Sequence, residues 1–245
     1  MMTEGTTDLG GETSPMDRPP ACTACPLHLG EGLRIIAMPG HGPMPCDLLV
    51  VGEAPGETED QRGVPFCGRS GMVLRRALAG ALVGAGLQPD AGFGLGLEVL
   101  PKGLEMRNRG TLVEARVRVT NTARCRPPGN RSPKPKTEAA VCVATHFWAE
   151  VASASPRLIL LLGNVAAKAV LGRDDFKVTG EDRVTPYVVT SPLTGESYST
   201  RVTFHPAAVL RNRVLGQYWK IDLERVAQEL HRGIQLGEGL VQSTR

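Results

Sequence analysis

The chain has 245 residues, of which 41% are hydrophobic and 22% are charged. This composition excludes disordered and fibrous chains, and the length suffices for one α/β domain with its own core. A formal net charge of +3 excludes a histone-like polycation. The longest apolar runs, such as 158–162, are far shorter than the ~20 residues of a membrane span, and the N-terminus lacks a signal-peptide charge pattern. We therefore expect a cytoplasmic protein.

The N-terminal 20 residues are polar, rich in Gly and Thr, and end in two prolines, a composition typical of a disordered tail. We expect one domain over 21–235 and a short C-terminal tail over 236–245. The segments 88–115 and 177–199 have no clear pattern, and the second fits either a hairpin or an insertion.

Four short apolar segments predict buried strands: 48–51, 116–120, 158–162 and 201–204. Helical patterns lie between and after them, at 70–83, 137–153 (with Thr137 as candidate N-cap), 164–171 and 216–231. This alternation predicts a single-domain αβα sandwich with a mainly parallel four-stranded sheet. Ligands bind beyond the carboxyl ends of the strands in such sheets. The candidate site residues are those that directly follow a strand: Gly52, Glu53, Asn121 and His205.

Four cysteines have a spacing that can close a metal site: Cys22, Cys25, Cys125 and Cys142. The CxxC pair follows a double proline rather than joining a strand to a helix, which disfavours a thioredoxin-type motif. Four thiolates can hold a tetrahedral ion or a cubane cluster, and packed, reduced thiols are the alternative. Spacing alone does not separate zinc from iron–sulfur. Two further thiols are predicted to have no ligand role: Cys46 and Cys67.

The loop over 52–71 combines four acids and five glycines with a single aromatic residue, Phe66. An aromatic side chain in a polar loop serves either as a flat surface for a ligand or as a hydrophobic anchor that pins the loop to the core. Both roles are compatible with the sequence.

Five signatures follow one another along the chain: CTACPLH, GEAPGETEDQRGVPFCGRSG, VTNTARCRPPGNRSPKP, LLLGNVAAKAVLG and TFHPAAVLRNR. Together, and in this order, they resemble the family 4 uracil-DNA glycosylases, the iron–sulfur class. The set is far more specific than any one motif. The resemblance covers about 22–76, 116–172 and 201–231, and it does not extend to the N-terminal tail or to 88–115.

The resemblance implies a pocket for a uracil base. Asn121 would accept a hydrogen bond from N3–H and donate one to O4, while Phe66 would stack on the ring. His205 would bind O2 and stabilise the uracil anion as the glycosidic bond breaks. The start of the loop would complete the pocket with Gly52, Glu53 and Ala54.

The acid that acts on the water is not fixed by the resemblance. Better-known uracil glycosylases carry an aspartate where this chain has Ala54. We expect Glu53 to orient or activate the water. Glu59 and Asp60 are alternatives for that role, or for a wall that excludes the methyl group of thymine.

The resemblance also implies a [4Fe-4S] cluster, in preference to zinc, on Cys22, Cys25, Cys125 and Cys142. We expect it to lie away from the pocket and to order a loop that faces DNA. Because duplex DNA hides uracil in the base stack, the base must be flipped out. Val209 or Leu210 is the expected wedge, with packing under the last helix as the alternative. Phosphate contacts are expected from Arg69, Arg126, Arg131 and Arg211.

Positive charge is concentrated in one segment. Residues 107–136 hold nine Lys or Arg against one acid, Glu114, a local charge of +8. This segment contains Asn121 and Cys125, so we expect a basic face beside the pocket, along the path of the duplex.

The expected function is monofunctional excision of uracil from DNA in base excision repair, because the predicted pocket holds no lysine for Schiff-base lyase chemistry. Two alternatives remain: a related glycosylase for another deaminated or mismatched base, and a non-catalytic iron–sulfur DNA-binding module. We expect uracil-containing DNA as the partner, a nucleoid-associated monomer, and neither a nucleotide cofactor nor a membrane partner.

Overall fold

The structure, a computed structural model, describes residues 22–94 and 112–237. The expected tail over 1–20 lies outside the described residues, as does 236–245 beyond Gly237. The middle of the unassigned segment 88–115 also lies outside them.

The centre of the fold is a five-stranded sheet in the order β4-β1-β5-β7-β6. Its strands are β1 (Leu48–Gly52), β4 (Val117–Asn121), β5 (Leu158–Leu162), β6 (Tyr187–Thr190) and β7 (Ser197–Thr203). The four predicted strands are confirmed as β1, β4, β5 and β7, and each is parallel to its neighbour among these four. The fifth strand, β6, pairs antiparallel with β7, so the segment 177–199 contributes a hairpin at the sheet edge.

The two central strands, β1 and β5, are buried at every position. Their continuous Leu, Ile and Val runs are typical of parallel strands covered on both faces. The edge strand β6 is different, because only one of its four residues is buried. Its weak pattern explains why the sequence predicts four strands for this sheet, whereas five of the described strands form it.

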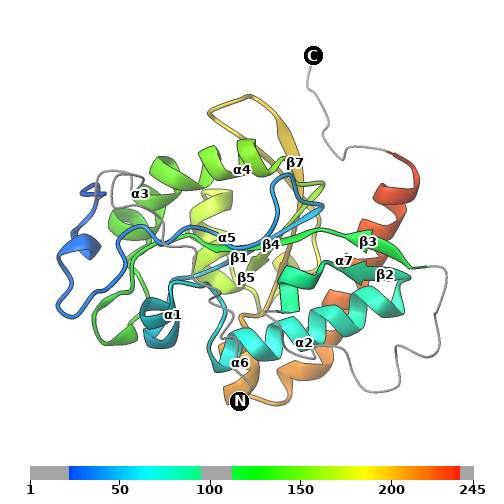
Figure 1. The fold of residues 1–245 in the computed structure, drawn as a ribbon, viewed down its shortest axis with the longest axis horizontal. Coiled ribbons are helices and arrows are strands. Elements are labelled where there is room, and N and C mark those ends of the chain that lie inside the picture. The colour runs from blue at the N-terminus through cyan, green and yellow to red at the C-terminus, as the bar shows by residue number, and fades with distance from the viewer. Residues whose placement is uncertain (1–21, 95–111, 238–245) are drawn as a thin grey trace, which may run out of the picture.

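Helices cover both faces of the sheet, as the predicted sandwich requires (Figure 1). On one face, α2 (Arg69–Gly84) lies beside α7 (Leu215–Gln235). On the other lie α4 (Trp148–Ala154) and α5 (Gly163–Leu171), as expected for right-handed crossovers between parallel strands. Two short helices stand at the carboxyl ends of β1 and β7: α1 (Glu57–Arg62) and α6 (Pro206–Arg211).

Helix α4 is the last part of a longer helical segment that begins at Pro135. It contains two π-helical turns, Pro135–Ala139 and Val143–Phe147, on either side of α3 (Ala140–Cys142). The expectation that Thr137 caps this helix is wrong. A proline is well suited to a first helical position, so the helix begins two residues earlier, and the Glu138 carboxylate accepts the Lys134 N–H at 2.7 Å.

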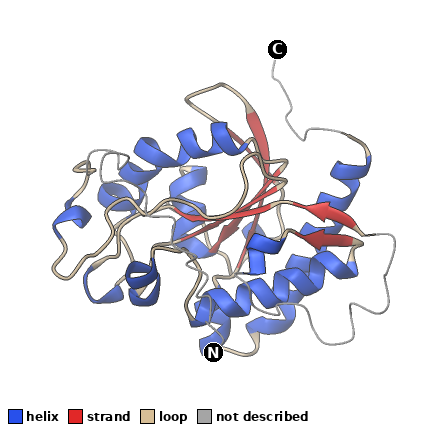
Figure 2. Cartoon of the chain, viewed as in Figure 1, coloured by secondary structure: helices blue, strands red, loops and turns tan. Residues whose placement is uncertain are grey.

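The described ends of the segment 88–115 contribute to a separate two-stranded parallel sheet (Figure 2). Its strands are β2 (Leu87–Pro89) and β3 (Val113–Ala115). Asp90 ties it to the main sheet, because its carboxylate accepts the Val117 N–H at 2.7 Å. Short 3₁₀ turns complete the described elements: Pro26–Leu29, Ala91–Gly94, Pro128–Asn130 and Glu181–Arg183. Among the described residues, no helix is both long and apolar enough to cross a membrane.

A buried cluster of charges joins β4 to α4. The Glu150 carboxylate accepts hydrogen bonds from Arg118 Nε at 2.6 Å, from Thr120 Oγ1 at 2.9 Å and from the Arg124 guanidinium. The side chains of Arg118, Arg124 and Glu150 are each 8% exposed. Removing one member of such a group leaves the others charged and without a partner in a medium of low dielectric constant.

The variant Glu150→Gln should therefore lower the free energy of unfolding by about 3–5 kcal/mol, measured by urea denaturation. The matched control is Glu224→Gln on α7, whose carboxylate forms only an exposed pair with Lys220 at 3.8 Å. It should change stability by less than about 0.5 kcal/mol. Equal losses in the two variants would contradict the role given to the buried carboxylate.

Candidate active site

The carboxyl ends of the four parallel strands meet at one edge of the sheet. Gly52 ends β1, Asn121 ends β4, Gly163 follows β5, and His205 stands two residues beyond β7. Gly52 and Asn121 are direct partners in the strand register. The sequence-predicted residues Gly52, Asn121 and His205 are thus brought together, at the place where open α/β sheets bind ligands.

Gly52 allows two side chains to approach each other closely. A Cβ atom at this position would clash with the Phe66 ring and with the side-chain oxygen of Asn121. Gly163 serves His205 in a similar way, because a Cβ there would lie 3.0 Å from the His205 Cβ. Two strand-end glycines therefore provide the space in which the Phe66 ring lies near both the Asn121 amide and the His205 imidazole.

The Asn121 side chain is unusual for a buried polar group. Asn121 is 5% exposed, and its amide has no hydrogen-bond partner in the part of the chain that the structure describes. Its amide atoms are nevertheless not among the fully enclosed polar atoms without a partner, so they are open to a group that enters the site. An amide that lies beside an aromatic ring with its donors and acceptor free can bind the polar edge of a planar ligand.

His205 is the N-cap of α6, and its Nδ1 accepts the Ala207 N–H at 3.3 Å. This bond places the ring proton on Nε2, so that the neutral imidazole has one N–H donor left. Burial, together with the positive charge of Arg211, lowers the pKa of His205 to about 4. Its ring centroid lies 6.5 Å from that of Phe66.

The structure separates the three candidate acids. Glu59 is engaged, since its carboxylate accepts the Gly68 N–H at 2.8 Å. The carboxylate of the buried Asp60 accepts the N–H of Ile35 at 2.9 Å and the N–H of Arg34 at 3.1 Å. Glu53 differs, because its carbonyl is held by Ala123 N–H at 2.9 Å while its carboxylate has no partner among the described residues.

The four candidate ligand cysteines line one cavity, together with Arg124 and His146. Two of their sulfur atoms accept a backbone N–H group, and a third lies near a histidine nitrogen. The Ala37 N–H donates to Cys125 Sγ and the Arg124 N–H donates to Cys142 Sγ, each at 3.3 Å. His146 Nε2 lies 3.2 Å from Cys22 Sγ. Such N–H groups stabilise thiolates in metal and cluster sites.

This cavity is closer to the predicted pocket than expected. Cys25 and Cys125 share a small apolar cluster with Leu27 and with Ala54, which follows Glu53 in the loop. The cysteine site and the loop that carries Glu53 therefore pack against each other. Cys46 and Cys67 are not among the residues that line the cavity. Burial raises the pKa of Cys46 to about 12, as for an inert thiol.

The expected DNA-contacting residues differ in exposure. Val209 packs against the core, which agrees with the packing role that was the alternative to a wedge. Leu210, in contrast, is 38% exposed. Arg69 at the start of α2 and Arg211 at the end of α6 are exposed, and neither has an ion-pair partner among the described residues.

Much of the positive charge expected along 107–136 is paired with acids. Arg107 and Arg109 lie outside the described residues. Every arginine of the segment that the structure describes pairs with an acid, in the pairs Arg116–Asp47, Arg118–Glu150, Arg124–Glu150, Arg126–Glu57 and Arg131–Glu138. All of these acids lie outside the segment, so a local charge count does not include them.

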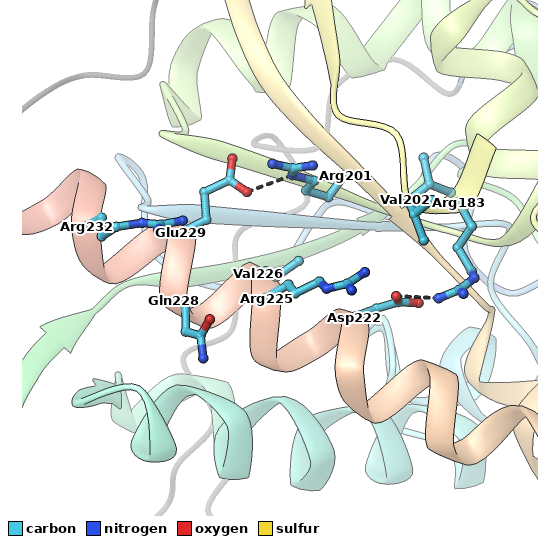
Figure 3. A pocket seen from close by; sticks show the side chains of 10 residues that line it. Arg183, Arg201, Val202, Asp222, Arg225, Val226, Gln228, Glu229 and Arg232 are labelled. Carbon is cyan, nitrogen blue, oxygen red and sulfur yellow. Dashed lines mark hydrogen bonds and ion pairs between the residues drawn. The ribbon is translucent and has the colours of Figure 1, made fainter. Parts of the chain in front are cut away.

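One group near the site has no signal in the sequence. Asp222 on α7 accepts a hydrogen bond from Thr203 Oγ1 at 2.6 Å and pairs with Arg183 (Figure 3). The Arg183 guanidinium lies 5.3 Å from the centre of the Phe204 ring. These contacts fix the end of β7 immediately before His205. They join residues that are 19 to 39 positions apart in the chain, so no motif reveals them.

The comparisons with known proteins agree with this geometry. Residues 39–224 match the family model described as the uracil DNA glycosylase superfamily. The type-4 uracil-DNA glycosylase of Pyrobaculum aerophilum is 31% identical over 202 residues, which cover 82% of this chain and 86% of the relative. That of Thermotoga maritima is 33% identical over 199 residues (80% and 82%), and that of Archaeoglobus fulgidus 28% over 208 residues (85% and 87%). The chain therefore belongs to the uracil-DNA glycosylase superfamily and, within it, to the type-4 family.

The imidazole of His205 should titrate with a pKa near 4 and carry its proton on Nε2 at neutral pH, as measured by ¹⁵N NMR. The unfolded chain protonates this residue near pH 6.5, but the folded chain does not until about pH 4. Its neutral state therefore supports stability above pH 6.5, and that support is lost as the pH falls towards 4. Arg211→Gln should raise the pKa of His205, and a pKa near 6.5 in the unaltered protein would contradict this environment.

Proposed function

We propose that this protein excises uracil from DNA by hydrolysing the bond between the base and the deoxyribose, which leaves an abasic site. The observation that carries the proposal is the open amide of Asn121, which lies beside the Phe66 ring with no partner in the described part of the chain. A flipped uracil supplies both a flat face for the ring and a polar edge for the amide.

Base recognition follows from the donor and acceptor pattern of one amide. The Asn121 oxygen accepts N3–H of uracil, and its NH₂ group donates to O4. Cytosine has an acceptor at N3 and a donor at C4, so the same arrangement opposes it. A site whose buried polar groups are left unpaired by the wrong ligand discriminates strongly.

His205 assists the departure of the base. As the glycosidic bond breaks, negative charge develops on the uracil, and the Nε2–H group of His205 donates to O2. Because the pKa of His205 is lowered to about 4, the imidazole is neutral at physiological pH and acts as a fixed hydrogen-bond donor. A donor that is already in place stabilises the developing charge without reorganisation.

Glu53 is the residue we assign to the sugar side of the reaction. Positive charge develops on the deoxyribose, and a carboxylate that is not engaged elsewhere can both stabilise this charge and orient the attacking water. Glu59 and Asp60 hold backbone N–H groups of the protein, which makes them positioning groups rather than candidates for this role.

We assign a [4Fe-4S] cluster to Cys22, Cys25, Cys125 and Cys142. In the described part of the chain, no group of three or more His, Cys, Asp or Glu is arranged to hold a metal ion. The four thiols instead surround a common cavity. Four thiolates around one cavity would hold a cubane cluster, for which cysteine thiolates are the usual ligands. Bound there, the cluster would cross-link the N-terminal segment to the 125–142 region.

The proposed DNA contacts rest on exposed residues beside the pocket. Leu210 is the better wedge, because Val209 is committed to the core. Arg69 and Arg211 are positioned for phosphates, while Arg126 and Arg131 would first have to leave Glu57 and Glu138. We propose that the protein acts as a monomer on nucleoid DNA in the cytoplasm.

Asn121→Ala and His205→Ala should each lower the rate of uracil excision by about 10²–10³-fold, because each removes a preorganised group at the base. The measurement is cleavage by alkali of a uracil-containing oligonucleotide after incubation with the protein. The exposed Gln228→Ala variant should retain the full rate. Undiminished excision by both site variants would refute the pocket. Tight DNA binding by the unaltered protein, without excision, would favour a non-catalytic binding module.

Cys142→Ser should abolish the absorbance near 400 nm and the iron content of protein that is purified anaerobically, because the cluster would lose a ligand. Cys46→Ser should leave both unchanged, since Cys46 lies away from the cavity. Stoichiometric zinc without iron in the unaltered protein would overturn the assignment.

A further inference from the structure

Arg75, on the second turn of α2, is a fully buried arginine without a carboxylate at ion-pair distance among the described residues. Its guanidinium instead donates to backbone carbonyls. Nε donates to the Phe66 oxygen and Nη2 to the Pro65 oxygen, both at 3.0 Å, while Nη1 donates to the oxygen of Phe93. The group also lies over the Phe93 ring, 5.2 Å from its centre.

Burying a guanidinium is costly, and an aliphatic side chain would fill the same space without that cost. What an aliphatic side chain lacks is the planar set of donors, which here joins three carbonyls of two separate loops. Burial lowers the pKa of Arg75 to about 10, so the group is still charged at neutral pH. Arg75 therefore suits a role that requires several hydrogen-bond donors in a fixed geometry.

The backbone at Phe66 needs such support. Phe66 has a φ of 57°, in the left-handed region that costs a residue with a side chain about 1–2 kcal/mol. Its carbonyl lies so close to Gly71 that a Cβ there would overlap it. A second hydrogen bond stabilises this loop, in which the Glu59 carboxylate accepts the Gly68 N–H. The peptide of Phe66 is thus held between the start of α2 and the Arg75 guanidinium.

We propose that Arg75 is the positioning residue for Phe66: by binding the carbonyls of Pro65 and Phe66 it holds the left-handed backbone that turns the ring towards Gly52 and Asn121. The inference rests on the proposed function, in which Phe66 stacks on the flipped base. Arg75 acts through Phe66 and does not contact the base. A displacement of about 1 Å at a reacting centre can lower a rate 10²-fold.

The first test is a comparison of neighbouring arginines. Single-turnover excision from single-stranded uracil DNA is measured for Arg75→Met, Arg75→Lys and the control Arg76→Met, which alters an exposed residue of the same helix. Arg75→Met should be slower by about 10–100-fold, Arg75→Lys should recover part of the rate, and Arg76→Met should match the unaltered protein. An Arg75→Met rate within threefold of the unaltered rate overturns the proposal.

The second test separates positioning from general stability. If Arg75 acts through Phe66, adding Arg75→Met to Phe66→Ala should cause no further loss of rate, although the melting temperature still falls. Multiplied losses in the double variant would show that Arg75 acts by another route and would overturn the proposal.

The third test does not depend on activity. Hydrogen exchange followed by mass spectrometry should show faster exchange over 63–68 in Arg75→Met, with β5 (158–162) unchanged. Faster exchange in both segments, or in neither, overturns the role of Arg75. Failure of the proposed function gives a different result, in which the unaltered protein excises no uracil while exchange over 63–68 still responds to Arg75→Met.

Discussion

The site depends on the absence of a side chain at the end of β1. Because Gly52 has no Cβ, the Phe66 ring and the Asn121 amide lie against the same point of the backbone. Gly52 and Asn121 are also partners in the sheet register, so the geometry is set by the strands and not by a loop alone. A ring from a loop and an amide from a strand are thereby held at a fixed spacing.

The parts of the fold and the site that the sequence predicts are those set by local pattern. Apolar runs that end at a turn define β1, β4, β5 and β7, and parallel strands necessarily bring their carboxyl ends together. Asn121 and His205 could therefore be placed at the same edge of the sheet before any geometry was known. The five signatures suggested the chemistry of these positions. Four of them lie within residues 39–224, which match the superfamily, whereas CTACPLH, at 22–28, lies before this range.

The features that the sequence does not predict depend on partners far apart in the chain. Nine basic residues in 107–136 suggest a basic face, but Arg118 and Arg124 are buried and share the carboxylate of Glu150, which comes later in the chain. The same limit applies to Arg75, since nothing in a helical pattern indicates that one arginine bonds to a loop nine residues earlier. The edge strand β6 is missed for another reason: it is short, and only one of its residues is buried.

The unpaired amide of Asn121 has a consequence for the protein without its ligand. Asn121 is 5% exposed, and its amide atoms are not among the fully enclosed polar atoms without a partner in the described part of the chain, so solvent reaches them. A ligand that enters must therefore replace the hydrogen bonds that water makes with this amide. Only a ligand whose donors and acceptors match those of the amide recovers the lost hydrogen bonds, so the exchange of water for ligand itself selects the ligand.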